Sequence, residues 1–293
     1  MTRSPRWLKR SWSPDGVART VRSLVSDLNL VTVCESSLCP NLRECYSQRQ
    51  LTFMILGNRC TRSCRFCAVP SGGPEPADPS EPWRVAEAAS RLGLTHIVIT
   101  SVARDDLRDE GATHFVAVID AVRRVNPGSS VEVLVPDFHA RAELIRQVIE
   151  EGRPEVFAHN METIERLSHL VRPQADYRRS LRTLASAAAL GSGSLIKSSL
   201  MVGLGETQEE VGQTFEALLA SGVTHLTIGQ YLRPGSGPRH LPVAHYVTPE
   251  QFQAYEQLAR RSGFAWVRSG PFVRSSYHAV DALKTMRETT QVR

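Results

Sequence analysis

Short apolar runs alternate with amphipathic stretches along most of the chain from about residue 52 onward. Each run is nearly continuous, as is typical of strands buried on both faces of a parallel sheet, and the stretches between them have helical spacing. The strand-like runs lie at 52–58, 95–101, 131–137, 155–160, 195–203 and 225–230. This pattern predicts an α/β fold with a partial (βα)6 barrel, although a doubly wound sheet fits the pattern as well.

The turns that follow these runs carry most of the polar and cysteine-bearing segments. In chain order they read CTRSCRFC, SVARDD, PDF, HNMET, GLGET and QYLRP. Working sites of parallel α/β folds lie at the carboxyl ends of the strands. We therefore expect these segments to converge on one rim of the barrel.

The pattern divides the chain into three parts. Residues 51–234 hold the expected barrel, 1–50 form an N-terminal extension, and 235–293 form a C-terminal extension. The two extensions belong to no predicted β–α unit, so we expect them to pack on the barrel. The Pro- and Gly-rich loop at 70–82 is the most irregular stretch.

Composition narrows the possible partners. Apolar residues make up 41% of the 293 positions and charged residues 22%, as in ordinary globular proteins. No apolar run is long enough to span a bilayer, and the net charge of +5 is scattered without a nucleic-acid-binding motif. We expect neither a membrane nor a nucleic acid partner. The basic start, MTRSPRWLKRSW, lacks the apolar region of a secretory signal, although its Arg/Ser bias is faintly similar to that of a transit peptide.

All six cysteines lie between residues 34 and 67, a clustering that favours metal binding over disulfides. Cys60, Cys64 and Cys67 form C-x3-C-x2-C directly after the first strand. Three such thiolates can hold three irons of a [4Fe–4S] cluster and leave the fourth iron open. Zinc is the alternative, but it usually takes paired C-x2-C knuckles. The triplet, with the aromatic Phe66 directly before its third cysteine, resembles that of radical S-adenosylmethionine (SAM) enzymes, in which the open iron binds SAM.

Cys34, Cys39 and Cys45 form a second triplet, C-x4-C-x5-C, with neither zinc-knuckle nor ferredoxin spacing. Because both triplets together use every cysteine, a second cluster must leave an iron open or recruit an oxygen or nitrogen ligand. The nine histidines are candidates, and so is the stretch VRSSYHA at 273–279. By local chemistry alone, that stretch fits a helix cap or a solvated turn better than a cluster ligand.

Taken together, these motifs resemble the lipoyl synthase family over nearly the whole chain. What distinguishes that family among radical SAM enzymes is the pairing of the two cysteine triplets with a C-terminal RSSY. The matching segments are WLK (7–9), TVCE, CPN and EC within 32–45, TFMILGNRCTRSCRFCAVP (52–70), VITSVARDDLRD (98–109), LVPDF (134–138), HNMET (159–163), VRP (171–173), KSSLMVGLGE (197–206), GQYLRP (229–234) and GPFVRSSYHA (270–279).

The resemblance implies two [4Fe–4S] clusters and SAM as cofactors. It assigns Cys60, Cys64 and Cys67 to the SAM cluster. For the auxiliary cluster it assigns Cys34, Cys39, Cys45 and, as the fourth ligand, Ser276. The C-terminal extension would then fold back over the N-terminal one.

The resemblance also implies a reaction. Two sulfur atoms from the auxiliary cluster enter carbons 6 and 8 of an octanoyl chain that is held on a lysine of a lipoyl carrier domain. Unactivated C–H bonds require a radical, so the protein's task is positioning and the exclusion of side reactions. Expected partners are carrier domains of 2-oxoacid dehydrogenase E2 subunits and the glycine cleavage H protein, an electron donor such as ferredoxin or flavodoxin, and an iron–sulfur carrier. A cytoplasmic location is expected, because WLK already matches the family near its N-terminus.

Further residues match family segments that contact SAM. We expect Thr100 and Ser101 to meet the SAM amino group, and Asn160 and Glu162 to meet the ribose. Close approach of the adenosyl group is expected at Gly203, Gly205 and Glu206. Two arginines are expected to pair with carboxylates near the clusters, Arg172 and Arg274.

Two positions depart from the family pattern: Glu110 and Ser199 each stand where glycine is common. If either position needs a left-handed backbone, the replacement costs about 1 kcal/mol. Other functions stay open as alternatives: another radical SAM sulfur insertion such as methylthiolation or biotin formation, a two-cluster electron carrier, or a zinc-stabilised α/β domain. The departures also fit either a main enzyme or a paralogue.

Overall fold

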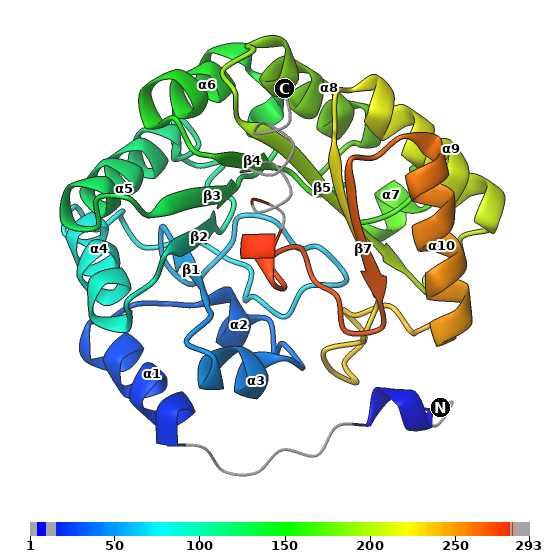
Figure 1. Ribbon diagram of the computed structural model, residues 1–293, viewed down its shortest axis with the longest axis horizontal. Coiled ribbons are helices and arrows are strands. Elements are labelled where there is room, and N and C mark those ends of the chain that lie inside the picture. The colour runs from blue at the N-terminus through cyan, green and yellow to red at the C-terminus, as the bar shows by residue number, and fades with distance from the viewer. Residues whose placement is uncertain (1–4, 10–15, 282, 284–293) are drawn as a thin grey trace.

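A computed structural model describes residues 5–9, 16–281 and 283 of the chain. Its centre is one sheet of parallel strands in the order β1-β2-β3-β4-β5-β6-β7, curved into an open barrel with helices outside (Figure 1). The strands are β1 (Thr52–Ile55), β2 (His96–Ser101), β3 (Ser130–Leu134), β4 (Val156–Ala158), β5 (Leu195–Val202), β6 (His225–Gln230) and β7 (Trp266–Gly270). The predicted partial barrel of parallel strands is confirmed.

The seventh strand was not expected. The segment 235–293 was predicted to lie outside any β–α unit, but α10 (Pro249–Ser262) and β7 extend the barrel by one such unit. Only Trp266 and Val267 of β7 are buried, and Arg268 and the residues after it are partly exposed. Such a short and half-polar strand lacks the continuous apolar run by which buried parallel strands are recognised.

The outer helices follow the strands in sequence. They are α4 (Glu81–Leu92), α5 (Ala112–Val125), α6 (Ala142–Arg146), the π-helical turn η3 (Gln147–Gly152), α7 (Glu165–Val171), α8 (Tyr177–Ala189) and α9 (Gln208–Ala220), with the short turn η2 (Phe138–Ala140) after β3. Local chemistry fixes several ends: Thr207 with Glu210 and Thr248 with Gln251 form capping boxes, and α4 ends at Gly93 with φ 66°.

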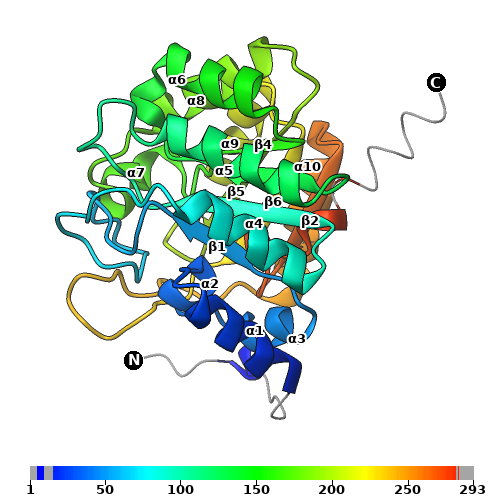
Figure 2. The same cartoon turned by 90° about the vertical axis from the view of Figure 1, so that its left-hand side faces the viewer.

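The N-terminal extension consists of η1 (Arg6–Leu8), α1 (Gly16–Asp27), α2 (Val33–Ser36) and α3 (Leu42–Ser47). In Figure 2, α1, α2 and α3 lie together on the side of the barrel that carries α4 and β1. The extension joins the sheet directly, because the Met54 N–H donates to the Val31 carbonyl at 2.8 Å. The second cysteine triplet is thereby fixed against the first strand.

Among the residues that the structure describes, no helix is both long enough and apolar enough to cross a membrane.

Candidate active site

The first cysteine triplet lies in the turn that leaves β1, as predicted. The Cys60 sulfur accepts hydrogen bonds from the N–H groups of Arg62 at 3.4 Å and Ala103 at 3.3 Å. Desolvation raises the pKa of Cys64 to about 11 and that of Cys67 to about 12, and each thiol also feels the charge of Cys60. The three thiols are therefore close together, and those of Cys64 and Cys67 stay neutral by themselves. A bound metal would supply the positive charge that makes them thiolates.

Ion pairs that the sequence did not reveal hold this turn. The guanidinium of Arg62 binds Asp105 and Asp137, at 2.7 and 2.8 Å, and Asp137 also binds Arg179 at 2.8 Å. Burial opposes ionisation of Asp137, but the Arg62 hydrogen bond and charge outweigh it and hold the pKa of this carboxyl well below its usual range. The segments RDD and PDF contain these aspartates, but no sequence pattern indicates that both contact one arginine.

A second unpredicted support is the long connection after β6. The Leu241 N–H donates to the Arg65 carbonyl at 3.2 Å, Arg239 Nη2 donates to the Val69 carbonyl at 3.1 Å, and His240 Nε2 lies 3.1 Å from the Cys67 carbonyl. The connection therefore packs directly against the cysteine turn. Arg239, His240 and Leu241 lie in no motif that could have indicated this contact.

The carboxyl ends of β2 and β4 bring the expected SAM-contact residues to the same rim. Ser101 Oγ and Asn160 Oδ1 are buried, and neither has a hydrogen-bond partner among the described residues. Buried polar atoms normally have partners, so this pair fits a polar ligand such as SAM. Thr100, by contrast, already donates its hydroxyl to the Leu134 carbonyl at 2.9 Å.

Glu162 is close enough to the triplet and to two arginines to interact with their charges. It accepts a hydrogen bond from Asn160 Nδ2 at 2.9 Å. Desolvation raises the pKa of Glu162, although the charges of Arg172 and Arg274 act in the opposite direction. Arg172 itself donates to the carbonyls of Asn160 and Met161. A carboxylate in this place could accept hydrogen bonds from ligand hydroxyls.

The GLGET turn after β5 is explained largely by contacts within the protein. Gly203 has φ 102°, and an added Cβ there would overlap Gln230 and the His245 carbonyl. Glu206 accepts hydrogen bonds from the N–H groups of Gly203 and Leu204. Gly205, with φ 105°, faces a more open space. Contact of Gly203, Gly205 and Glu206 with the adenosyl group stays a prediction.

The second triplet lines a cavity of about 310 Å³ at the other end of the strands. The walls include Cys34, Cys39, Cys45 and Ser276, which are the four residues expected at the auxiliary cluster. Thr52, the first residue of β1, also lines the cavity and donates its hydroxyl hydrogen to Ser276 Oγ at 2.8 Å. The structure thus brings the serine to the triplet, and its role as a ligand stays a prediction.

Cys34 is the most buried of the six cysteines. Burial and the neighbouring Cys39 raise the pKa of the Cys34 thiol to about 12, while hydrogen bonds from Thr52 lower it in part. A thiol in this environment is neutral at physiological pH unless a cation binds it. Three thiols and one hydroxyl around a cavity suit a metal cluster better than a free redox pair.

The C-terminal segment after β7 reaches this cavity by crossing the barrel. Asn41 Nδ2 donates to the Phe272 carbonyl at 2.6 Å, and the Tyr277 hydroxyl donates to Glu44 at 3.1 Å. On the barrel side, an added Cβ at Gly229 of β6 would overlap the Val273 carbonyl. In Figure 1 the red segment lies over the middle of the ring of strands. Glycine at 229 therefore provides the close approach that this crossing requires.

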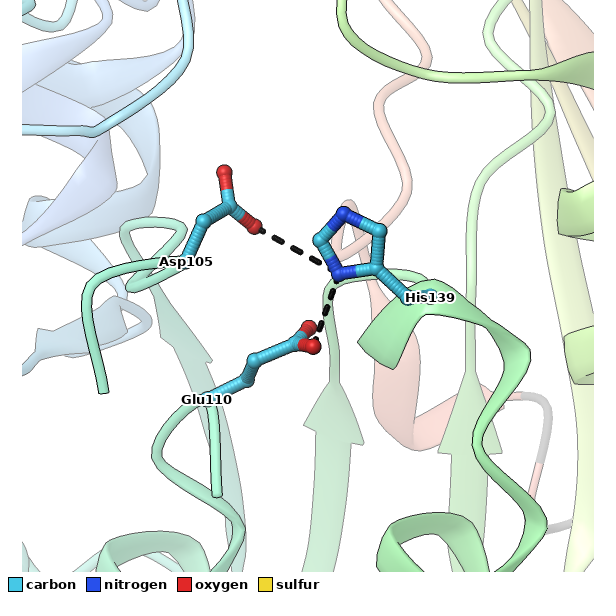
Figure 3. A group of neighbouring side chains, drawn as sticks. All are labelled: Asp105, Glu110 and His139. Carbon is cyan, nitrogen blue, oxygen red and sulfur yellow. Dashed lines mark hydrogen bonds and ion pairs between the residues drawn. The ribbon is translucent and has the colours of Figure 1, made fainter. Parts of the chain in front are cut away.

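Glu110 takes part in a charged group with Asp105 and His139 (Figure 3). His139 Nδ1 lies 2.7 Å from Glu110 Oε1 and 3.9 Å from Asp105 Oδ1. Although these side chains offer three possible metal ligands, Arg62 and Arg141 already bind the two carboxylates, Arg141 at 3.0 Å from Glu110. A cation would compete with both guanidiniums. We interpret the group as an ion-pair clasp between the turns after β2 and β3.

The two departures from the family pattern differ in their backbone. Glu110 has φ 48°, in the left-handed region that glycine adopts without strain. Ser199 lies inside β5, where the extended backbone suits any residue. Only the first departure therefore carries the expected backbone cost.

Comparisons with known proteins agree with this geometry. Residues 54–218 match the model of the Radical SAM superfamily. Lipoyl synthase of Caldanaerobacter subterraneus subsp. tengcongensis is 51% identical over 97% of this chain and 99% of its own length. Lipoyl synthase of Rubrobacter xylanophilus is 52% identical over 97% of this chain and 87% of its own.

Solved structures support the fold alone. HydG, a maturase of the [FeFe]-hydrogenase, matches with a TM-score of 0.55 and 15% identity over 85% of this chain and 62% of its own. Methylornithine synthase (PylB) matches with a TM-score of 0.51 and 13% identity over 90% of this chain and 80% of its own. The family model and the two relatives lead to one conclusion: the chain belongs to the lipoyl synthase family of the radical SAM superfamily.

Proposed function

We propose that this protein is a lipoyl synthase, which inserts two sulfur atoms at C6 and C8 of an octanoyl chain on a lysine of a lipoyl carrier protein. The observation that carries the proposal is the cavity in which Cys34, Cys39, Cys45 and Ser276 come together, separate from the Cys60 triplet. Family membership supports the radical chemistry, and this second site supports a dedicated sulfur donor.

Cys60, Cys64 and Cys67 would hold the cluster that binds SAM. The chemistry supplied there is the reductive cleavage of SAM, which yields a 5′-deoxyadenosyl radical able to abstract hydrogen from unactivated carbon. Ser101 and Asn160 offer buried polar atoms to the SAM molecule. Thr100, Glu162, Arg172, Gly203, Gly205 and Glu206 are proposed to complete this pocket.

The auxiliary [4Fe–4S] cluster is a substrate in this proposal, because it gives up its sulfur. Cys34, Cys39, Cys45 and Ser276 would bind it, with serine as the weakest ligand, since iron in sulfide clusters normally takes thiolates. Thr52 orients the serine hydroxyl through the 2.8 Å hydrogen bond. A hydroxyl held by a second side chain can take up a proton and leave more readily than a fourth thiolate.

We propose the same three-part division as expected from the sequence pattern. Residues 1–50 supply the auxiliary cysteines, 51–234 form the SAM-binding part of the barrel, and 235–293 add α10 and β7 to the barrel and supply Ser276. The lipoyl carrier would present its octanoyl-lysine between the two cysteine sites. E2 subunits, the glycine cleavage H protein, ferredoxin or flavodoxin, and an iron–sulfur carrier are proposed partners, and the cytoplasmic location stays a prediction.

The test is anaerobic reconstitution followed by turnover with SAM, reductant and an octanoyl-lysyl peptide. We expect roughly eight irons per chain, in line with two [4Fe–4S] clusters, and mass-spectrometric detection of 5′-deoxyadenosine and dithiolated peptide. Cys34→Ala should abolish sulfur insertion and retain 5′-deoxyadenosine formation. Deoxyadenosine without thiolated peptide in the unmodified protein would overturn the substrate assignment. Binding of zinc alone would overturn the cluster assignment.

A further inference from the structure

Arg62 is a buried cation inside the first cysteine turn. Its residue is 5% exposed, and its N–H donates to the Cys60 sulfur at 3.4 Å. The guanidinium lies between two carboxylates, with Nε 2.9 Å from Asp105 Oδ2 and Nη2 2.8 Å from Asp137 Oδ1. Any charge on the cluster ligands is therefore felt by a cation that is itself held rigidly in place.

The two carboxylates around Arg62 are not equivalent. Asp137 is completely buried and shares its charge with Arg179. Asp105 is 27% exposed and has Arg62 as its only arginine among the described residues, with Thr61 donating a hydroxyl to it at 2.9 Å. In the clasp of Figure 3, Asp105 Oδ1 lies 3.9 Å from His139 Nδ1, whereas Glu110 Oε1 lies 2.7 Å from it. Asp105 is therefore the more exposed of the two carboxylates that bind Arg62.

Buried ion pairs often contribute little to stability, because desolvation offsets their attraction. Their charges still act strongly on a neighbouring redox centre in a medium of low dielectric constant. A cluster becomes more negative when it is reduced, so a nearby cation favours the reduced state and a nearby anion opposes it. Net charge and hydrogen bonds to the sulfurs are known controls of cluster potential.

We propose that Arg62 is a positioning residue that sets the reduction potential of the cluster at Cys60, Cys64 and Cys67, and that Asp105 offsets its charge. The proposal rests on the proposed function only through the assignment of these cysteines as cluster ligands. It assigns opposite effects on the reduction potential to Arg62 and Asp105, which form an ion pair.

The experiment compares Arg62→Gln, Asp105→Asn and Arg62→Lys with the unmodified full-length protein after anaerobic reconstitution. The reduction potential is measured by redox titration with electron paramagnetic resonance, following the signal that changes when SAM is added. Arg62→Gln should shift the potential to a more negative value and Asp105→Asn to a more positive one. Arg62→Lys keeps the charge and should stay closer to the unmodified protein than Arg62→Gln.

A matched control removes a cation outside this network. Arg84 pairs with the exposed Asp78 near the start of α4, so Arg84→Gln should leave the potential unchanged. Shifts of Arg62→Gln and Asp105→Asn in the same direction, or no shift in Asp105→Asn, would overturn the proposal. If Arg62→Gln does not retain the cluster, the reduction potentials of Asp105→Asn and Arg62→Lys still test the proposal.

No step of this test requires sulfur insertion. If the unmodified protein forms no thiolated peptide but the two potentials move apart as stated, the proposed function fails and this inference stands. If lipoyl product forms normally and the reduction potentials do not move, the proposed function stands and this inference fails.

Discussion

The Thr52 hydroxyl donates a hydrogen bond of 2.8 Å to Ser276 Oγ, across 224 positions of the chain. Thr52 begins β1, the same strand that leads to Cys60. Its side chain also forms a hydrogen bond with Cys34. The first residue of β1 therefore orients a side chain of the auxiliary site, and the turn that follows the same strand carries the cysteines of the SAM cluster. This arrangement connects the two sites through a rigid element.

Replacement of Ser276 should separate the two chemistries. Ser276→Ala removes the only hydroxyl proposed as a cluster ligand, so we expect loss of iron from the auxiliary cluster and loss of lipoyl product. Formation of 5′-deoxyadenosine should continue, because the Cys60 triplet is untouched. Ser275→Ala, one residue earlier in RSSY, is the control and should behave like the unmodified protein. Iron analysis and mass spectrometry of both products measure the difference, and equal loss in the two variants would contradict the assignment.

Thr52→Val tests the orientation of the serine without removing it. Valine keeps the shape of threonine but leaves Ser276 Oγ without its donor. Residues that orient metal ligands typically contribute about 10- to 100-fold to affinity or activity. We expect a loss of lipoyl product at the lower end of that range and faster release of auxiliary iron to a chelator. Unchanged iron release would show that the hydrogen bond does not orient the ligand.

Gly229→Ala should displace the C-terminal segment from the barrel. Since an added Cβ would overlap the Val273 carbonyl, the segment must shift, at a cost of about 1–3 kcal/mol typical of overpacking. Auxiliary iron should fall, and limited proteolysis should cut more readily after residue 270, while SAM binding to the barrel persists. Gly237→Ala is the control, because nothing lies within 4 Å of an added Cβ there. Equal protease resistance of the two variants would refute the crossing.

The sequence indicated much of this arrangement, for identifiable reasons. Buried parallel strands leave continuous apolar runs, so β1 to β6 could be located, and the spacing of Cys60, Cys64 and Cys67 marks a cluster wherever it occurs. Ser276 was different. By local chemistry a serine in RSSY fits a helix cap or a solvated turn better than a ligand, and only the family resemblance selected it.

Other features depend on tertiary contacts that one-dimensional patterns do not record. The meeting of Arg62 with Asp105 and Asp137 joins three separate turns, and the cover of Cys67 by His240 comes from a segment without a motif. The strand β7 was missed because only two of its residues are buried. The placement of the auxiliary cavity at the amino ends of β1 and β2, away from the rim, likewise needed the structure.

The clasp around Glu110 should contribute to stability despite its backbone strain. Glu110 is 5% exposed and pairs with His139 and Arg141, which are themselves partly open to solvent. Glu110→Gln keeps the size and removes the charge, so we expect a loss of about 1 kcal/mol in the free energy of unfolding. Glu110→Gly loses the same contacts but relieves the left-handed strain, so it should be less destabilised than Glu110→Ala. Chemical denaturation measures all three, and an Ala variant as stable as the Gly variant would argue against strain.

Stability should fall in mild acid because of His159. Burial, with the charge of Arg172, lowers the pKa of this imidazole from 6.5 to about 4. Its Nδ1 lies 2.9 Å from the Val135 carbonyl, to which it donates, and Nε2 lies 2.9 Å from the Ser180 hydroxyl. Between pH 6.5 and 4 the unfolded chain binds a proton that the folded chain does not, so stability drops as the pH falls through this window. The full loss from this group is about 3 kcal/mol.

His159→Gln cannot titrate, so its free energy of unfolding should depend less steeply on pH in the same window. Glutamine can still donate to the Val135 carbonyl and accept from Ser180, which limits other effects of the change. The measurement is the denaturant midpoint of both proteins from neutral pH down to about pH 5, and it is the difference in slope that counts. His169→Gln serves as the control for the loss of a histidine, since this side chain is exposed on the outer helix α7. Parallel pH profiles for the unmodified protein and His159→Gln would mean that His159 is charged in the fold or titrates alike in both states.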